Sequence, residues 1–246
     1  MARNNNGRFY AGQAPALGRG AQERLAHAQA LVVGAGRVGM NAALGLHAAG
    51  VGVITIIDLQ VVEPEQLGPY WFATEADLGQ PKARVLADFL SRRRIGTVRA
   101  IHQPVEAPAC ARLFHDADLV ISCANTTPAR LAAERRSVTA RIPVIQAAAF
   151  DGRQRYGGMI HIRRPSDPEQ SCYGCLLDAN KKFERGEGLL ASVTAVIGYL
   201  AAHVAMLELG QESYRGPNAN LLVLDVENAV FEALVVERRP GCQICS

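Results

Sequence analysis

The amino-acid sequence predicts an α/β fold built on a doubly wound, mostly parallel sheet with an antiparallel C-terminal extension. Two observations predict it. Short apolar runs rich in β-branched residues alternate with helix-length segments from residue 30 to residue 147, as in a parallel sheet covered on both faces. After residue 150 this alternation stops, and the end of the chain shows a hairpin pattern. We therefore expect a main α/β domain over residues 1–150 and an extension, continuous with it, over residues 151–246.

The first 150 residues divide into an arm and an alternating series of strands and helices. Residues 1–20 hold several Gly, Asn and Pro residues and form the irregular arm. Apolar and β-branched composition predicts strands at 30–33, 53–58, 98–103, 119–123 and 143–147. Apolar periodicity, together with Pro near a helix start and Gly after a helix end, predicts helices at 21–28, 41–49, 81–94, 109–115 and 128–140.

The extension has a different pattern. Residues 156–162 predict an antiparallel strand, and residues 163–180 form a polar loop. An apolar helix is expected at 193–209. Residues 221–226 and 229–236 then predict a hairpin that turns at Glu227 and Asn228.

The bulk composition excludes several classes of protein. A net charge of +3 is too small for a nucleic-acid-binding face, and 49% hydrophobic residues indicate a globular chain. The longest apolar stretch, 193–209, carries His203 and Glu208, so it predicts a core helix rather than a membrane span. The polar N-terminus lacks the apolar stretch of a signal peptide. We expect a cytoplasmic protein with neither nucleic acid nor membrane as a partner.

A glycine-rich turn follows the first predicted strand. Gly34, Gly36 and Gly39 have the G-x-G-x-x-G spacing, and Asp58 ends the next strand. In a Rossmann-like sheet these glycines allow the tight turn, the approach of phosphates to the backbone and close helix–strand packing. The helix N-terminus favours phosphate, and the acid accepts hydrogen bonds from ribose hydroxyls. The sequence predicts a nucleotide site here; the alternative is a glycine turn that serves packing only.

Four of the six cysteines form two C-x-x-C pairs, Cys172 with Cys175 and Cys242 with Cys245. Four thiolates make a closed tetrahedral site, which is the structural kind of zinc site. Such a zinc ion would tie the end of the chain to the loop after residue 162. The alternative is a set of redox or surface thiols. Cys110 and Cys123 stand alone and are predicted to have no role in a site.

These motifs together resemble the ThiF/MoeB-type adenylating enzymes, which are related to the ubiquitin-activating enzymes. The resemblance runs from about Arg8 to Cys245. Besides the glycine turn, it rests on six segments in the family's order: GAQERL at 20–25, AGVG at 49–52, GQPK at 79–82, DLVISC at 118–123, SCYGCL at 171–176 and PGCQIC at 240–245.

The resemblance implies a homodimer that binds ATP and magnesium. It also implies adenylation of the C-terminal glycine carboxylate of a ubiquitin-like or sulfur-carrier protein, or of a peptide. By position, the three glycines would hold phosphates, Asp58 the ribose, and Lys82 the charge that shifts onto pyrophosphate. We also assign Arg37 and Gln66 to nucleotide binding, and Asn125 to catalysis. The alternative for Lys82 is a solvated lysine in the first turn of a helix.

The chain departs from the family pattern at several positions. Pro69 stands where a phosphate-binding Arg is expected, and a second family Arg falls on Ala11 or Gly12. Asn125, or Ala124 in a shifted register, replaces the magnesium-binding Asp. Gln60 replaces the second acid of an Asp-x-Asp motif, and no cysteine occurs between residues 181 and 192. Asn125 would hold magnesium less firmly than a carboxylate. Arg8, Arg37, Arg153 or Arg155 could replace the missing positive charge.

Three interpretations therefore stay open. The first is an ATP-dependent adenylyltransferase with altered phosphate contacts. The second is a degenerate member that binds a nucleotide or a partner without turnover. The third, an NAD-dependent oxidoreductase, fits the glycine turn but not the cysteine pairs, and no acid–base pair for hydride chemistry stands out in the sequence.

Overall fold

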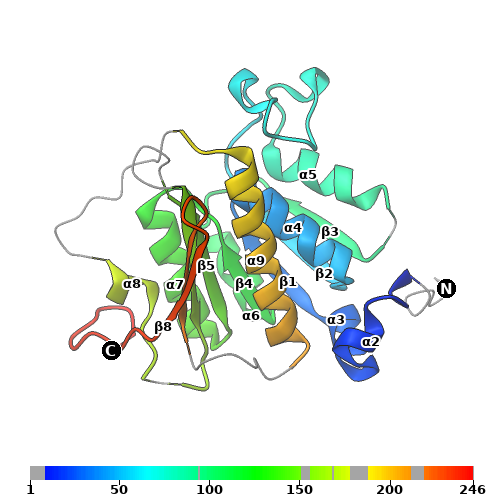
Figure 1. Ribbon diagram of the computed structural model, residues 1–246. Coiled ribbons are helices and arrows are strands. Elements are labelled where there is room, and N and C mark those ends of the chain that lie inside the picture. The colour runs from blue at the N-terminus through cyan, green and yellow to red at the C-terminus, as the bar shows by residue number, and fades with distance from the viewer. Residues whose placement is uncertain are drawn as a thin grey trace.

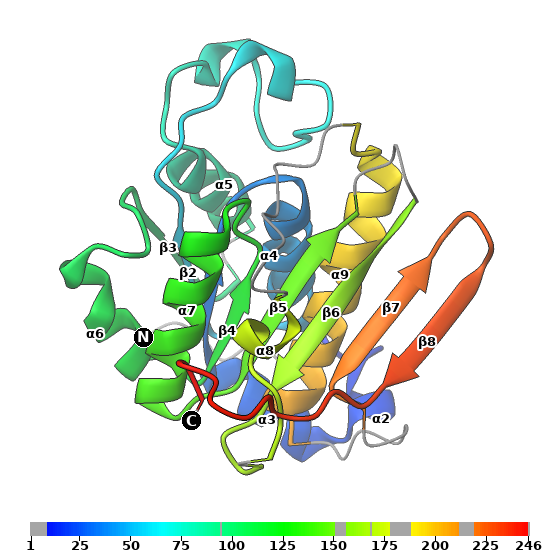
Figure 2. The ribbon, with the colours of Figure 1, turned by 90° about the vertical axis from the view of Figure 1, so that its left-hand side faces the viewer.

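The computed structural model describes residues 9–93, 95–150, 156–167, 169–177, 188–211 and 219–245. All named strands join one eight-stranded sheet in the order β3-β2-β1-β4-β5-β6-β7-β8 (Figures 1 and 2). The first five in this order run parallel, and β6, β7 and β8 are antiparallel. The strands are β1 Gln29–Val33, β2 Val53–Ile57, β3 Thr97–Ile101, β4 Leu119–Ser122, β5 Val144–Ala149, β6 Gly157–Arg163, β7 Leu221–Asp225 and β8 Val230–Leu234. The predicted fold class is confirmed.

Helices cover both faces of the sheet, as the alternating pattern predicts. They are α2 Ala14–Leu17, α3 Arg19–His27, α4 Arg37–Ala49, α5 Lys82–Ser91, α6 Ala111–His115, α7 Thr127–Ala140, α8 Tyr173–Leu176 and α9 Ala191–Leu209, with short 3-10 turns η1 Pro64–Gln66, η2 Glu75–Asp77 and η3 Pro108–Cys110. Strand β1 shows why both faces need cover. Ala30 and Val32 belong to the core under α4, α5 and α9, whereas Leu31 and Val33 belong to the core under α6 and α7.

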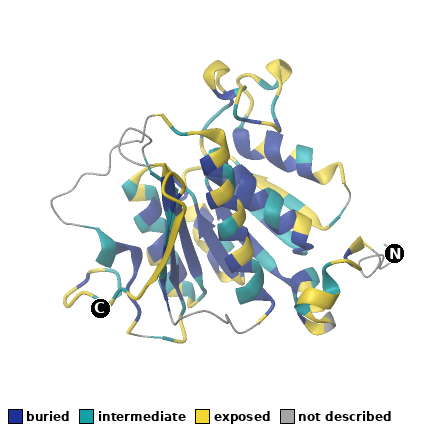
Figure 3. Cartoon of the chain, in the orientation of Figure 1, coloured by how far each residue is buried: buried dark blue, intermediate teal, exposed yellow. Residues whose placement is uncertain are grey.

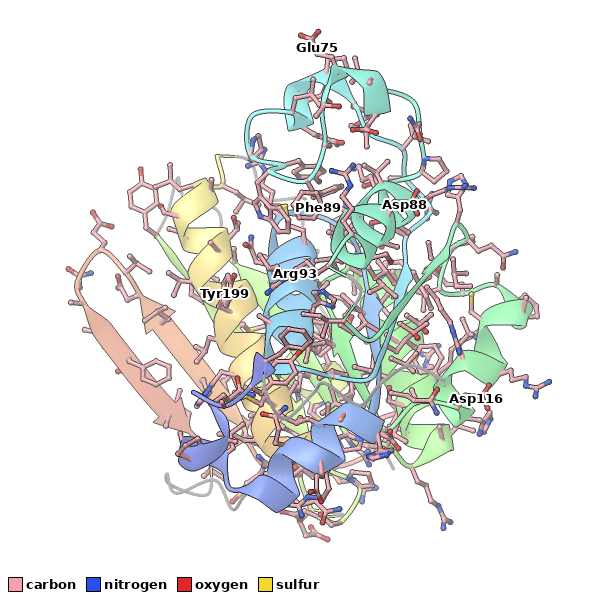
Figure 4. All side chains as sticks on the ribbon, turned by 90° about the vertical axis from the view of Figure 1, so that its right-hand side faces the viewer. Glu75, Asp88, Phe89, Arg93, Asp116 and Tyr199 are labelled. Carbon is pink, nitrogen blue, oxygen red and sulfur yellow. The ribbon has the colours of Figure 1, made fainter. Side chains whose placement is uncertain are left out.

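Helices α4 and α9 lie side by side on one face of the sheet (Figure 4). Glycines make this close approach possible, since a Cβ on Gly198 would lie 2.5 Å from the Val38 carbonyl oxygen. A Cβ on Gly45 would lie 2.5 Å from that of Ala202 and 3.4 Å from the ring of Tyr199. The pairing of residue 38 with 198 and of 45 with 202 means that the two helices run in the same direction. Their N-termini therefore lie at the same edge of the sheet.

Helix α9 is long and apolar enough to span a membrane by length and composition alone. Half of its apolar window is nevertheless buried inside the protein. It contacts α4, β5 and β6, and Ile197, Ala201 and Ala205 are fully buried. This is the core helix that the sequence predicts for residues 193–209.

The antiparallel strands extend the same sheet beyond residue 150. Strand β6 pairs with β5 over six residues, from Val144 with Arg163 to Ala149 with Gly158. The predicted hairpin is present, and Ala229 takes a left-handed conformation at its turn, with φ 54°. Strand β8 lies at the sheet edge with every residue exposed (Figure 3). Among the described residues, no other element therefore packs over the apolar side chains of β8 enough to bury them.

Candidate functional site

The candidate site lies where β1 and β4 end side by side, with Val33 opposite Ser122. The chain leaves β1 for α4 on one face of the sheet and leaves β4 for α7 on the other face. Such a switch point opens a crevice at the carboxyl ends of parallel strands, which is where ligands bind in this class of sheet. The glycine turn and the segment containing Asn125 both lie at this edge.

The three glycines of the turn differ in how strictly the local geometry requires them. Gly34 has φ +97°, and a Cβ there would lie 3.0 Å from the backbone of Cys123. A Cβ on Gly39 would lie only 1.8 Å from the carbonyl oxygen of Gly34. Gly36 caps α4, and a Cβ there would meet only the Tyr70 hydroxyl, at 3.9 Å. Gly34 and Gly39 are thus required for packing, while the turn itself tolerates a side chain at Gly36.

We expect substitutions at Gly39 and Gly36 to have different effects. Gly39→Ala should destabilise the protein by more than about 3 kcal/mol, because the new methyl group overlaps the backbone of the turn. Gly36→Ala should leave the melting temperature nearly unchanged and weaken ATP binding, because its methyl group would lie where phosphate is expected to approach. Thermal melts and calorimetry with ATP test both. Equal stability of the two variants would contradict the packing role of Gly39.

A chain of hydrogen bonds links the glycine turn to Lys82. The backbone N–H of Ala35 donates to Asp58 Oδ2 at 2.6 Å, and that of Gln60 donates to Asp58 Oδ1 at 2.7 Å. Lys82 Nζ donates to Gln60 Oε1 at 3.0 Å. The backbone N–H of Lys82 also donates to the Gln60 carbonyl at 2.9 Å. Residues separated by almost 50 positions in sequence thus form one connected group.

Lys82 is buried, with only 1% of its surface exposed. Its ammonium group lies 5.5 Å from the centroid of the Tyr70 ring. The interpretation of Lys82 as a solvated lysine is therefore wrong. A cation linked by hydrogen bonds to the glycine turn is suited to bind an anionic ligand at this edge.

The other predicted site residues differ in their surroundings. Asn125 is exposed. Gln66 is buried, and its side chain forms a capping box with Glu63, with bonds of 3.1 Å and 2.9 Å. Arg37 is half-exposed and donates to the Leu189 carbonyl oxygen at 2.7 Å. Arg8, Arg153 and Arg155 lie outside the described residues.

The N-terminal position expected to carry an arginine lies far from the glycine turn. Gln13 donates to the carbonyl of Ala49 at 2.9 Å, which places residues 11–13 at the C-terminal end of α4. The turn lies at the other end of this 13-residue helix, about 20 Å away. Ala11 and Gly12 therefore cannot complete the site of their own chain.

Sequence reasoning missed a buried polar group on α7. Arg130 donates to the Ala147 carbonyl at 2.9 Å and lies 5.6 Å from the Tyr173 ring centroid. Gln146 Nε2 donates to Glu134 Oε2 at 2.8 Å, and burial raises the pKa of the Glu134 carboxyl to about 7. The sequence does contain a signal for this group. Arg130, Glu134 and Ser137 follow the i, i+4, i+7 spacing of one helix face, and all three are buried.

The four predicted zinc ligands come together from two distant segments. Their Sγ atoms all lie within 4.8 Å of one another. The Sγ–Sγ distance is 3.4 Å between Cys172 and Cys242, 3.6 Å between Cys175 and Cys245, and 3.8 Å between Cys172 and Cys175. Tetrahedral thiolates around zinc lie about 3.8 Å apart, whereas disulfide sulfurs lie about 2.05 Å apart. The cluster fits zinc, and no pair of these four cysteines is at disulfide distance.

Buried polar side chains hold the first cysteine pair on the sheet. His161 on β6 lies within hydrogen-bond distance of Ser171 Oγ, at 3.0 Å, and Asn220 donates to the same oxygen at 3.2 Å. Asn220 also exchanges two 2.8 Å bonds with the backbone of Val236. Ser171 directly precedes Cys172, so these contacts position the cluster against β6 and the hairpin. Cys110, by contrast, is a buried core residue.

Comparison with known proteins decides the family. A family model described as ThiF family matches residues 10–244. The chain belongs to the ThiF family. Molybdopterin-synthase adenylyltransferase of Salmonella typhimurium is 29% identical over 228 residues, covering 91% of this chain and 89% of that protein. Sulfur carrier protein ThiS adenylyltransferase of Escherichia coli is 28% identical, covering 91% and 88%.

Solved structures show the same fold. The Microcin C7 biosynthetic enzyme MccB in complex with N-formylated MccA superposes with a TM-score of 0.78 at 21% identity, covering 99% of this chain and 76% of that one. The match to the family model confirms the resemblance inferred from the sequence motifs. The named relatives are adenylyltransferases, the class of enzyme that the sequence motifs lead us to expect.

Proposed function

We propose that this ThiF-family protein is an ATP-dependent adenylyltransferase. Its substrate would be the C-terminal carboxylate of a small ubiquitin-like or sulfur-carrier protein, or of a peptide. The observation that supports this most is the buried Lys82, linked through Gln60 and Asp58 to the glycine turn at one edge of the sheet. The names of the adenylyltransferase relatives support the same reaction.

In the proposed reaction a carboxylate oxygen of the substrate bonds to the α-phosphorus of ATP. The bond between the α-phosphorus and the bridging oxygen breaks, and pyrophosphate leaves with the electron pair. The N–H groups at the start of α4 and the backbone at Gly34, Gly36 and Gly39 would bind phosphate oxygens. Lys82 would stabilise the charge that develops on pyrophosphate. A magnesium ion would supply further charge compensation, and Asn125 would contribute an amide oxygen to it.

The test is ATP–pyrophosphate exchange with candidate carboxylates: small carrier proteins that end in glycine, and synthetic peptides. Exchange that depends on one of these substrates supports the proposal. A degenerate member would show no exchange with any carboxylate while still binding a nucleotide or a partner. Binding of NAD in place of ATP would favour an oxidoreductase, the third interpretation.

A second prediction concerns Asp58. Asp58→Asn should weaken ATP binding by about tenfold, because an amide accepts hydrogen bonds from ribose hydroxyls less strongly than a carboxylate. The same variant should bind 2′,3′-dideoxy-ATP as the wild type does, because that nucleotide lacks both hydroxyls. Calorimetry with both nucleotides separates ribose recognition from the bond between Asp58 and Ala35. An equal loss for both nucleotides would assign Asp58 to the support of the turn alone.

We also propose that the protein is a cytoplasmic homodimer. Large apolar side chains are exposed on α9 and at the edge strand: Val196 and Tyr199 are 46% and 45% exposed, and Phe231 is 54% exposed. An exposed apolar edge strand is a site where another chain adds or packs. Light scattering should report twice the chain mass at micromolar concentration. A monomer under those conditions would contradict the proposal.

A further inference from the structure

Arg37 is the first residue of α4 and lies inside the glycine turn. Its guanidinium donates to the Leu189 carbonyl oxygen at 2.7 Å, and this oxygen lies two residues before α9. The first turn of α4 contains no acidic residue. Among the residues that the structure describes, no carboxylate pairs with Arg37 within 4.0 Å. In this part of the structure the positively charged Arg37 side chain is therefore hydrogen-bonded to a neutral carbonyl group.

This position is electrostatically unfavourable for a cation. The N-terminus of a helix carries partial positive charge, so Arg37 and the free N–H groups of α4 repel one another unless an anion lies between them. Side chains in a helix also lean towards its N-terminus, which directs Arg37 towards the turn rather than away from it. Both features favour an anionic ligand with several oxygens at this turn.

We propose that Arg37 binds the polyphosphate of ATP and that it exchanges the Leu189 carbonyl for a phosphate oxygen when the nucleotide enters. This inference rests on the proposed function and assigns to Arg37 the selection of a triphosphate. A guanidinium binds phosphate more strongly than a neutral carbonyl, because the acceptor is charged and two parallel hydrogen bonds form.

The exchange also couples the nucleotide to the segment before α9. Helices α4 and α9 begin at the same edge of the sheet, and the bond from Arg37 to Leu189 links their N-terminal ends. When Arg37 turns to phosphate, the link to residue 189 is lost. The nucleotide thereby breaks the hydrogen bond between the glycine turn and the segment before α9.

The first experiment compares Arg37→Gln with the wild type. Glutamine keeps an N–H donor for the Leu189 carbonyl but removes the positive charge. ATP affinity, measured by calorimetry at fixed ionic strength, should fall by about tenfold, and adenosine affinity should stay within about twofold. Arg112→Gln is the matched control, since it removes one positive charge from a side chain that is 88% exposed on α6. Unchanged ATP affinity in Arg37→Gln, or an equal loss for adenosine, would overturn the inference.

The second experiment is a crystal structure with a non-hydrolysable ATP analogue. It should show the Arg37 guanidinium bound to a phosphate oxygen and no longer bound to Leu189. A guanidinium that is still bound to the Leu189 carbonyl in that complex would contradict the proposed change of hydrogen-bond partner. Two different results separate the proposed function from the role of Arg37. A wild type that binds no ATP contradicts the proposed function and this inference together. A wild type that binds ATP and exchanges pyrophosphate, beside an Arg37→Gln variant of equal ATP affinity, contradicts the inference alone.

Discussion

Replacing Lys82 with methionine should lower the rate of ATP–pyrophosphate exchange by about a hundredfold or more, while ATP affinity falls only modestly. Loss of one electrostatic contact in a transition state costs on the order of 3 kcal/mol. The contact is expected to matter most as negative charge moves onto pyrophosphate, so the rate should fall more than binding does. Pro69 offers no cation where a phosphate-binding arginine is expected, which leaves Lys82 a large share of this stabilisation.

Methionine is a suitable replacement at this buried position because its side chain is similar in length to that of lysine and carries no charge. Lys82→Ala should abolish exchange, because the lost charge is joined by a loss of stability from the cavity that the smaller side chain leaves. Arg84→Ala is the control on the same helix, because its side chain is 72% exposed. It should exchange pyrophosphate at the wild-type rate. Brisk exchange by a well-folded Lys82→Met protein would show that the role assigned to this lysine is wrong.

Cys242→Ser should remove the zinc and strongly destabilise the protein. The wild type should contain about one zinc ion per chain, and the variant close to none, because three thiolates no longer close the tetrahedral site. Binding of a structural zinc ion contributes directly to folding free energy. Cys242 is buried and bridges the C-terminus to the loop of Cys172, so we expect a loss of about 4 kcal/mol or more.

Elemental analysis and chemical denaturation measure the two effects. Cys110→Ala is the matched control, since Cys110 is a buried thiol outside the cluster and its replacement should leave the zinc content unchanged. Wild-type protein that contains no zinc after purification without chelators would exclude the zinc site. Full zinc content in Cys242→Ser would assign the fourth ligand to another residue.

The strand and helix order could be predicted from the sequence because local patterns carry it. Strand β1 and helix α4 are each specified by a few adjacent residues, and the glycines between them allow only a tight turn. The carboxyl edge could also be predicted, since parallel strands bring the ends of β1 and β4 together. Element ends were predicted less well. Helix α5 ends at Ser91 and not at residue 94, because Arg92 and Arg93 donate to carbonyls only three residues back and Gly96 turns the chain with φ +67°.

The sequence by itself determined the family, the glycine turn and the two cysteine pairs, because each depends on residue types at fixed short spacing. Only the tertiary structure decided that Lys82 is buried against Gln60 and Tyr70, and that the Arg37 side chain binds the backbone before α9. It also decided that Ala11 lies at the far end of α4. The physical reason is that burial and charge pairing depend on contacts between residues distant in the chain, and no local pattern of residues specifies those contacts.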